Sequence, residues 1–278
     1  MSVLFDSNYP TITVYADFPA PVGTQDITEY VIDAYTWNGR RDEAAQFDAS
    51  AEFVLENWDG RFTAGLTSGA YTSGGVSFVR PKVGVRVTAA WASTTYNVWR
   101  GRAVAWVDDW VGEAIEGLDS LTVLQCEGLY SILAGWNGAP AALVGGNEFS
   151  GARFSRILTA IGWPFTSSVA YGTTPMSPTD LTGSGVEQLL EVCDAEGGAF
   201  YIEGDGQIVF EDRGSLMRNS RSNTSQVTFS EGSVFVRDVV PSSGDDQVIN
   251  RVAMTREGGV EQLVEDSTSQ TTYGGVSY

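Results

Sequence analysis

Five acidic residues in the middle of the sequence could provide the carboxylate pair of a glycoside hydrolase. Such a pair acts on a glycosidic bond when two carboxyl groups lie about 5 to 9 Å apart. The candidates are Glu191, Asp194, Glu196, Glu203 and Asp205. The first three fall on one predicted helix and the other two at a predicted hairpin turn, where solvated acids are ordinary. The sequence therefore favours surface acids over a catalytic pair.

Other patterns that could hold a ligand are incomplete. The pairs Asp108–Asp109 and Asp245–Asp246 could bind calcium, but no EF-hand ladder of oxygen ligands accompanies them, so solvated loop acids are favoured. The glycine-rich stretch 65–75 lacks the flanking strand and helix of a phosphate-binding loop. The sequence has no histidine, which excludes Ser-His-Asp and Cys-His sites. We predict no catalytic residue, no metal, no cofactor and no enzymatic activity.

The chain is strongly acidic. Among its 278 residues, 35 are acidic and 16 are basic, which gives a formal charge of −19. This sign repels nucleic-acid phosphate and anionic lipid, so sequence-specific DNA binding is disfavoured. Solubility is the simplest role for so many carboxylates.

Neither cross-links nor membrane segments are predicted. Cys126 and Cys193 lie in different contexts, and we interpret both as small buried hydrophobic residues. Residues 1–20 have no basic region before Pro10 and no long apolar run, so no secretory signal peptide is expected. No window approaches the roughly 18 consecutive apolar residues of a membrane span.

A largely β fold must position these residues. From residue 11 to about 128, apolar and polar residues alternate with a period of two, which predicts strands with one buried face each. The apolar sets are Ile12, Val14 and Tyr15; Ala51, Phe53 and Leu55; Val83, Val85 and Val87; Val104 and Trp106; and Leu121, Val123 and Gln125. Turn and loop residues at 57–61 and 65–75 separate them.

The pattern changes in the middle of the chain. Residues 136–149 are rich in Gly, Ala and Asn, which is typical of a domain connection. Helical spacing follows over 150–161, with Gly162 and Pro164 as a stop signal. The apolar positions of this helix are Phe154, Ile157, Leu158 and Ile161.

A second helix and a hairpin come next. Ser184 or Thr182 can cap the helix, and Gly197 can end it. Its apolar stripe consists of Val186, Leu189, Leu190 and Cys193. At 199–210, two apolar runs flank an Asp-Gly turn, which is a strong hairpin signal. Short strands are then expected at 227–229, 234–236, 248–254 and 260–264, followed from Thr268 by a loose or partner-ordered polar tail.

Nearly the whole chain carries an ordered series of short motifs. The first half contains Asp26-Ile27-Thr28-Glu29-Tyr30-Val31, Gly39-Arg40-Arg41, the run 47–62, Arg80-Pro81 and Trp99-Arg100-Gly101-Arg102. The second half contains Arg156-Ile157-Leu158, Gly162-Trp163-Pro164, the run 189–198, Gly204-Asp205-Gly206 and Asn250-Arg251-Val252. In this order, the motifs resemble those of minor tail proteins from siphophages of actinobacteria, the hub or tail-associated proteins of the tail tip.

The resemblance implies a mainly β fold with a small α/β insertion, with β-barrel domains of the phage tail hub type. Residues 1–135 would form a barrel that docks on the tail tube. Residues 136–215 would form the α/β insertion of two helices and a hairpin. Residues 216–278 would supply returning strands, the start of a second barrel and a loose C-terminal tail. Family members usually continue past the position of Tyr278 through this second barrel.

The resemblance also implies a structural role in the virion. The chain would be made in the host cytoplasm and built into the tail tip, where it closes or extends the DNA channel and takes part in tail assembly and host attachment. Its partners would be further copies in a homotrimer, the distal tail ring, the tail tube and the tape measure protein, with DNA only in transit. A carbohydrate-binding β module for the host envelope and a peptidoglycan hydrolase are the alternatives.

Assembly of this kind requires anchor residues at wide interfaces. Trp58, Trp99, Trp106 and Trp110 are candidates, although most are expected in the core because tryptophan is highly buried in β proteins. Unpaired edge strands near the C-terminus could be completed by a neighbouring subunit. Carboxylates lining a channel would repel DNA phosphates and let the genome pass.

Overall fold

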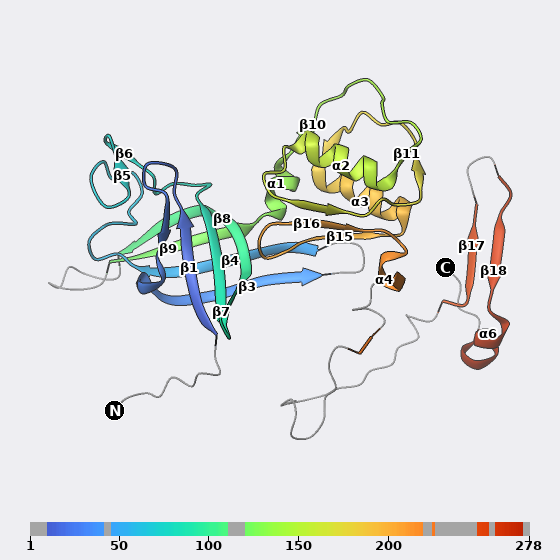
Figure 1. Cartoon of the computed structure of the whole chain (residues 1–278), viewed down its shortest axis with the longest axis horizontal. Helices are drawn as coiled ribbons and strands as arrows, with labels where there is room; N and C mark the ends of the chain where they lie inside the picture. The colour runs from blue at the N-terminus through green and yellow to red at the C-terminus, as the bar shows by residue number, and fades with distance from the viewer. Residues whose placement is uncertain are drawn as a thin grey trace, which may run out of the picture. The chain divides into compact units, whose positions relative to one another are not determined.

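The protein is represented by a computed structural model that describes residues 10–41, 46–110, 120–218, 224–225, 249–255 and 259–274 (Figure 1). The chain forms two compact units, Met1–Thr224 and Ser225–Tyr278. The first unit contains a large antiparallel sheet and a small α/β part. The prediction of a mainly β protein with a small α/β insertion is confirmed.

The large sheet is a curled half-barrel of seven antiparallel strands in the order β2-β1-β7-β8-β9-β4-β3 (Figure 1). These strands are β1 (Thr11–Asp17), β2 (Thr24–Asp26), β3 (Val31–Arg41), β4 (Gln46–Glu56), β7 (Gly84–Trp91), β8 (Thr94–Trp110) and β9 (Ser120–Gly128). A 3-10 turn, η1 (Thr28–Tyr30), precedes β3. The short strands β5 (Thr72–Ser73) and β6 (Val76–Ser77) pair with each other in the loop between β4 and β7.

Alternation buries one face of the sheet, as predicted for β4 and β7; of the set predicted for β1, Val14 is buried, but Ile12 is 38% exposed and Tyr15 lies on the opposite face. Val14 of β1, Phe53 of β4 and Val87 of β7 are all buried in one apolar core. At one end of the core, aromatic rings from four different segments pack together: Phe18, Phe62, Tyr71 and Trp106. The core therefore joins the strands to the loops between them.

The predicted buried face of β9 was wrong, and that of β8 was right for Trp106 but not for Val104. In β8, the register shifts between Ala103 and Ala105, and this bulge leaves Val104 47% exposed while Trp106 is buried. In β9, the buried residues are Thr122, Leu124 and Cys126, and the predicted set of Leu121, Val123 and Gln125 lies on the opposite face. A bulge changes the face of every later residue, and a hydrogen-bonded polar residue can occupy a core position.

Thr122 is tolerated in the core because its hydroxyl accepts a hydrogen bond from the buried side chain of Asn57. The Asn57 side chain is fully buried and donates to the hydroxyls of Thr122 and Thr63, at 2.8 and 2.9 Å. Its side-chain oxygen accepts from the Phe62 backbone N–H at 2.8 Å. Thr122 in turn donates to Asp108 at 2.8 Å. The turn at 57–61, predicted from composition, is thus anchored to β8 and β9 by a polar network.

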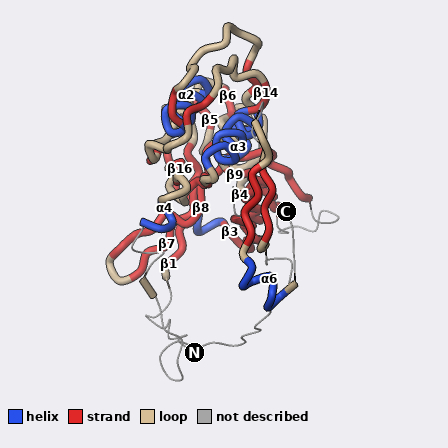
Figure 2. The backbone as a smooth tube through the Cα atoms, turned by 90° about the vertical axis from the view of Figure 1, so that its right-hand side faces the viewer, coloured by secondary structure: helices blue, strands red, loops and turns tan. Residues whose placement is uncertain are grey.

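The α/β part packs two helices against a three-stranded sheet. Helices α2 (Ser150–Ile161) and α3 (Gly185–Glu196) lie side by side (Figure 2). The sheet has the order β12-β16-β15, from β12 (Ser167–Val169), β16 (Ile208–Glu211) and β15 (Ala199–Ile202). A short helix, α1 (Tyr130–Gly135), connects β9 to this part and contributes Leu133 to its core. Both predicted helices and the predicted hairpin are confirmed.

Each long helix ends as its sequence predicts. Gly162 and Gly197 adopt left-handed conformations, with φ of 71° and 64°, and close the C-termini of α2 and α3. Ser184 is the N-cap of α3 and forms a capping box with Glu187. Cys193 on α3 and Cys126 on β9 are free and buried, as predicted, and burial raises the pKa of the Cys193 thiol to about 12.

Loss of this capping box is expected to destabilise α3. Replacing Ser184 with alanine removes the hydroxyl that accepts from the Glu187 backbone N–H, so we expect the free energy of unfolding to fall by about 1 kcal/mol. Urea denaturation followed by circular dichroism measures the change. Thr182, the other predicted cap, is exposed and is not the N-cap, so Thr182→Ala should change the value by less than about 0.5 kcal/mol. Equal losses in both variants would contradict the assignment.

Residues 136–149, interpreted from composition as a connection, are built into the α/β part. Strand β10 (Asn137–Gly138) pairs with β14 (Gly183–Ser184), and β11 (Glu148–Phe149) pairs with β13 (Pro175–Met176). The segment therefore belongs to the α/β part and pairs there with residues between 175 and 184.

The second unit contains an antiparallel pair and a helix. Strand β17 (Arg251–Met254) pairs with β18 (Gln262–Glu265); β17 lies within the predicted segment 248–254, and β18 overlaps the segment 260–264 and ends one residue beyond it. The expected strands at 227–229 and 234–236 lie outside the described residues. Residues Ser267–Tyr273 form helix α6, so the prediction of a loose tail from Thr268 was wrong there. The helix forms because Asp266 caps its N-terminus by accepting from the Ser269 backbone N–H.

Candidate functional site

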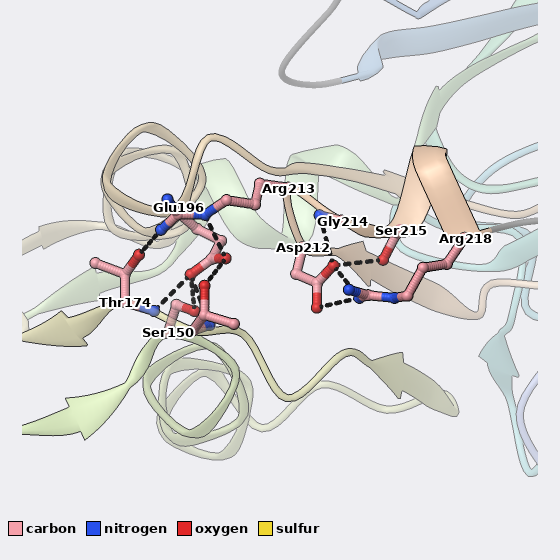
Figure 3. Close-up of polar contacts among 9 residues, drawn as sticks. Ser150, Thr174, Glu196, Asp212, Arg213, Gly214, Ser215 and Arg218 are labelled. Carbon is pink, nitrogen blue, oxygen red and sulfur yellow. Dashed lines mark hydrogen bonds and ion pairs between the residues drawn. The ribbon is translucent and has the colours of Figure 1, made fainter.

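Of the five candidate carboxylates, only Glu196 is buried, and its oxygens accept several hydrogen bonds from neighbouring segments. Its side chain accepts hydrogen bonds from the Ser150 hydroxyl at 2.7 Å and from the backbone N–H groups of Thr173 and Thr174 at 3.0 and 2.9 Å. Arg213 approaches it at 3.3 Å. Figure 3 shows the carboxylate pointing between these groups. Glu196 thus joins the end of α3 to the start of α2 and to the loop at 173–174.

The protonation of Glu196 suits a structural role. Burial by itself raises the pKa of the carboxyl, but the hydrogen bonds from Ser150, Thr173 and Thr174 outweigh burial and hold the pKa well below its ordinary value. A general acid at neutral pH needs a raised pKa, so the lowered pKa of Glu196 does not support a role as the proton donor of a hydrolase. This corrects the expectation that all five candidates are solvated acids.

The other four candidates are exposed. Glu191 and Asp194 lie on the solvent side of α3, and Glu203 and Asp205 lie in the hairpin loop between β15 and β16. Asp205 accepts from the Gln207 backbone N–H at 2.8 Å, which fixes the turn. These positions agree with the prediction of surface acids.

Two further acidic groups in the α/β part stabilise irregular segments. Glu148 binds both Arg153 and Arg156, and Arg153 also donates to the carbonyl oxygens of Gly145 and Ser177. Asp212 accepts from the backbone N–H of Gly214 and from Arg218, and it begins the short helix α4 (Ser215–Arg218) (Figure 3). In the α/β part, ion pairs and hydrogen bonds of charged side chains therefore hold irregular segments in place.

The proposed metal positions gain no support. Asp108 lies in strand β8 and accepts from Thr122, so it is not a loop acid. Asp245 and Asp246 lie outside the described residues. Within the described part of the chain, no cluster of three or more Cys, Asp or Glu side chains is arranged to hold a metal ion. In the same residues, no helix is long and apolar enough to cross a membrane.

Arg100 links the large sheet to the α/β part. Its guanidinium lies 4.6 Å from the centre of the Phe165 ring and donates to the Asp205 carbonyl oxygen at 3.3 Å. Beside it, Gly204 packs so closely on β8 that an added Cβ would overlap the Asn97 carbonyl oxygen. A cavity of about 80 Å³ lies at this junction, lined by residues of both parts including Trp99 and Tyr130.

Removal of Arg100 is expected to loosen this junction. In Arg100→Ala, the loop at 203–207 loses a hydrogen bond and the Phe165 ring loses a cation–π contact, so the backbone amides of the loop should exchange with solvent about tenfold faster. Hydrogen–deuterium exchange mass spectrometry measures the effect. Arg102→Ala is the matched control, because Arg102 lies on the same strand and pairs with Glu127 of β9. Unchanged exchange in the Arg100 variant would show that the junction does not depend on it.

The tryptophans predicted as interface anchors divide into two groups. Trp99 and Trp106 are buried in the core, and Trp58 is 70% exposed. The side chain of Trp110 lies outside the described residues. Exposed aromatic residues that the sequence did not single out lie at the β7–β8 hairpin, where Trp91 and Tyr96 are 46% and 55% exposed. Ile12 of β1 and Tyr96 are both register partners of Ala89, so these side chains share one face of the sheet.

A row of valines crosses the outer face of the sheet. Val107 of β8 and Val54 of β4 are both direct register partners of Val123 of β9, so the three side chains lie side by side. Val107 is 45% exposed. We call Val54, Val107 and Val123 the valine row. Val123 belongs to the set that the sequence placed in the core, but it lies on the outer face of β9 together with Gln125.

Arginines gather elsewhere on the outer face. Arg86 of β7 and Arg100 of β8 are direct register partners, and Asp17 lies 3.4 Å from the first and 3.7 Å from the second. Arg86 also stacks on the Tyr15 ring at 4.1 Å. Arg102, two residues along β8, pairs with Glu127 at 2.6 Å. We call Arg86, Arg100 and Arg102 the arginine cluster.

Comparison with known proteins gives a match in structure alone. No protein-family model and no curated protein sequence matches the chain. The tail protein from Neisseria meningitidis MC58 superposes with a TM-score of 0.54 and 11% identity, over 92% of this chain and 68% of that protein. The prophage tail protein gp18 from Listeria monocytogenes EGD-e gives 0.51 and 10%, over 96% and 71%.

A third structure, the 43 kDa tail protein of prophage MuSo2 from Shewanella oneidensis, gives a TM-score of 0.50 and 12% identity over 92% of this chain and 68% of that protein. The chain shares the fold of these tail proteins. The likeness extends over both the curled sheet and the α/β part, since nearly the whole chain is covered in each comparison.

Proposed function

We propose that the chain is a structural component of a phage tail, of the baseplate-hub or minor tail protein kind, at the tail tip. The observation that carries the proposal is the shared fold with three tail proteins over at least 92% of this chain. The ordered sequence motifs support the hub position and the siphophage origin. On this proposal, the chain is not an enzyme. The Glu196 carboxylate is consistent with that, because it already accepts hydrogen bonds from Ser150 and Thr174.

The surfaces of the molecule suit a role in assembly. Strands β8 and β7 present exposed side chains at Val107 and Trp91, and the loop after β4 presents Trp58; such side chains anchor protein interfaces. We propose that the partners are further copies of the chain in a homotrimer, the distal tail ring, the tail tube and the tape measure protein. The acidic excess would line the channel and repel DNA in transit.

Location in the virion tests the proposal directly. An antibody raised against the purified chain should label one end of the tail in immunogold electron microscopy of virions from the encoding genome. Label on the capsid, or its absence from purified virions that retain their tails, would overturn the tail-tip assignment. Native mass spectrometry of the chain mixed with the other tail proteins from that genome should show a ring or a mixed complex.

A further inference from the structure

A cavity with an uncharged wall lies in the α/β part. It has a volume of about 250 Å³ and is enclosed by α2, the loop that follows this helix and the first residue of β12. None of the residues that line it is charged, whereas Arg100 and Glu203 belong to the wall of the cavity at the junction with the large sheet. Enclosing an ion without a counter-charge is costly, so this wall favours a neutral occupant.

Two aromatic rings form one side of the cavity. Trp163 and Phe165 meet edge to face, with ring centroids 5.7 Å apart and planes at 69°. The backbone N–H of Trp163 donates to the Leu158 carbonyl oxygen at 3.0 Å, and the Arg100 guanidinium lies 4.6 Å from the centre of the Phe165 ring. The two rings are therefore held in place by the chain itself, which lowers the cost of ordering them around a ligand.

The remaining wall supplies hydrogen-bonding groups. Ser155 and Thr159 of α2 donate their hydroxyl protons back to the helix, to the carbonyl oxygens of Gly151 and Ser155 at 3.0 and 2.9 Å, so each hydroxyl oxygen keeps a lone pair that can accept. Ser167 adds an exposed hydroxyl. The indole N–H of Trp163 is buried and meets no acceptor in the described part of the chain, which is unusual for a buried donor.

We propose that this cavity binds one ring of a neutral sugar. The faces of a sugar ring carry C–H groups that pack on aromatic rings, and its hydroxyls both donate and accept, which matches a wall of two rings, three hydroxyls and one indole N–H. The volume lies below the roughly 300 to 1,000 Å³ of sites for drug-sized ligands, so it suits a single ring.

An apolar side chain of a protein partner fits this wall less well. Such a side chain would cover the hydroxyls of Ser155 and Thr159 and the Trp163 indole N–H without pairing with them, and unpaired polar groups oppose binding. Sugar binding here is an addition to the structural role in the tail and not an alternative to it. It does not depend on the position of the chain in the virion.

Titration of the full chain with sugars tests the site. Fluorotryptophan labelling gives fluorine NMR signals for the eight tryptophans, and the signal missing from Trp163→Phe identifies Trp163. The probes are the methyl glycosides of glucose, galactose, mannose and N-acetylglucosamine. At least one should shift the Trp163 signal saturably and leave the signal of Trp91, which is exposed outside the cavity, unchanged. No shift with any of these glycosides would overturn the proposal.

A hydroxyl deletion ties the binding to this cavity. Thr159→Ala removes one acceptor from the exposed side of α2 and should weaken binding of the active glycoside about fivefold in isothermal titration calorimetry. Ser168→Ala is the matched control, because Ser168 is exposed on β12 and does not line the cavity. Circular dichroism spectra identical to that of the unmodified chain would exclude unfolding as the cause.

Two further outcomes would count against the sugar site. Unchanged affinity in Thr159→Ala would place the sugar elsewhere on the chain. A shift of the Trp163 signal by N-acetylleucinamide, with none by a glycoside, would assign the cavity to an apolar side chain of a protein partner. Either outcome would overturn the inference, while immunogold labelling of the tail would still support the proposed function.

Discussion

Replacement of Glu196 with alanine is expected to lower the free energy of unfolding by about 3 kcal/mol. The change leaves the Ser150 hydroxyl and the Thr173 and Thr174 backbone N–H groups without their acceptor. A buried donor without an acceptor destabilises the fold by more free energy than its hydrogen bond contributed. Urea denaturation of the full chain, followed by tryptophan fluorescence, measures the loss. Glu191→Ala is the control, because Glu191 is exposed on the same helix and should change the value by less than about 0.5 kcal/mol.

The same residue should make the fold sensitive to acid. The folded pKa of Glu196 lies below the ordinary value of about 4.3, so its stabilising contribution is complete above that value and is lost as the pH falls below it. Glu148 and Asp212 also have lowered pKa values, so they contribute in the same direction. Glu196→Gln should therefore flatten part of the decline in stability between about pH 5 and pH 2. An unchanged pH profile in Glu196→Gln would show that the carboxylate is not held in its charged form.

The parts of the fold that could be predicted from sequence are local ones. The ends of α2 and α3 depend on Gly162, Ser184 and Gly197, which act within one turn of the helix. The hairpin of β15 and β16 is set by its Asp-Gly turn. Each signal is contained in a few neighbouring residues, so no knowledge of the tertiary structure is needed.

The features that escaped prediction depend on distant segments. Glu196 is one of several acids on a helix, and its burial follows from Ser150 and from Thr173–Thr174, which reach it only in the folded chain. The inward face of β9 is set by Asn57, whose amide satisfies Thr122 across 65 residues of sequence. Outward-facing Val123 has the same apolar character as a core residue, so its residue type alone does not show which face of β9 is buried.

The loop after β4 gives a second large effect. Replacing Phe62 with alanine is expected to lower the free energy of unfolding by about 4 kcal/mol, because the fully buried ring packs against Tyr30, Tyr71 and Trp106 with centroids 5.4, 5.5 and 5.9 Å away. The backbone of Phe62 is held by Asn57, so the loop cannot move to fill the cavity. Thermal and urea denaturation of the full chain measure the loss.

Trp58, four residues earlier in the same loop, is the informative control for Phe62. It is the larger side chain, but it is 70% exposed, so Trp58→Ala should change the free energy of unfolding by less than about 0.5 kcal/mol. If Trp58 anchors an interface in the tail, the substitution should instead weaken co-assembly with the other tail proteins by about tenfold while leaving the fold intact. A loss of stability comparable to that of Phe62→Ala would mean that Trp58 packs within the chain and is not available to a partner. Stability measurements thus report on the buried ring of Phe62, and assembly measurements report on the exposed ring of Trp58.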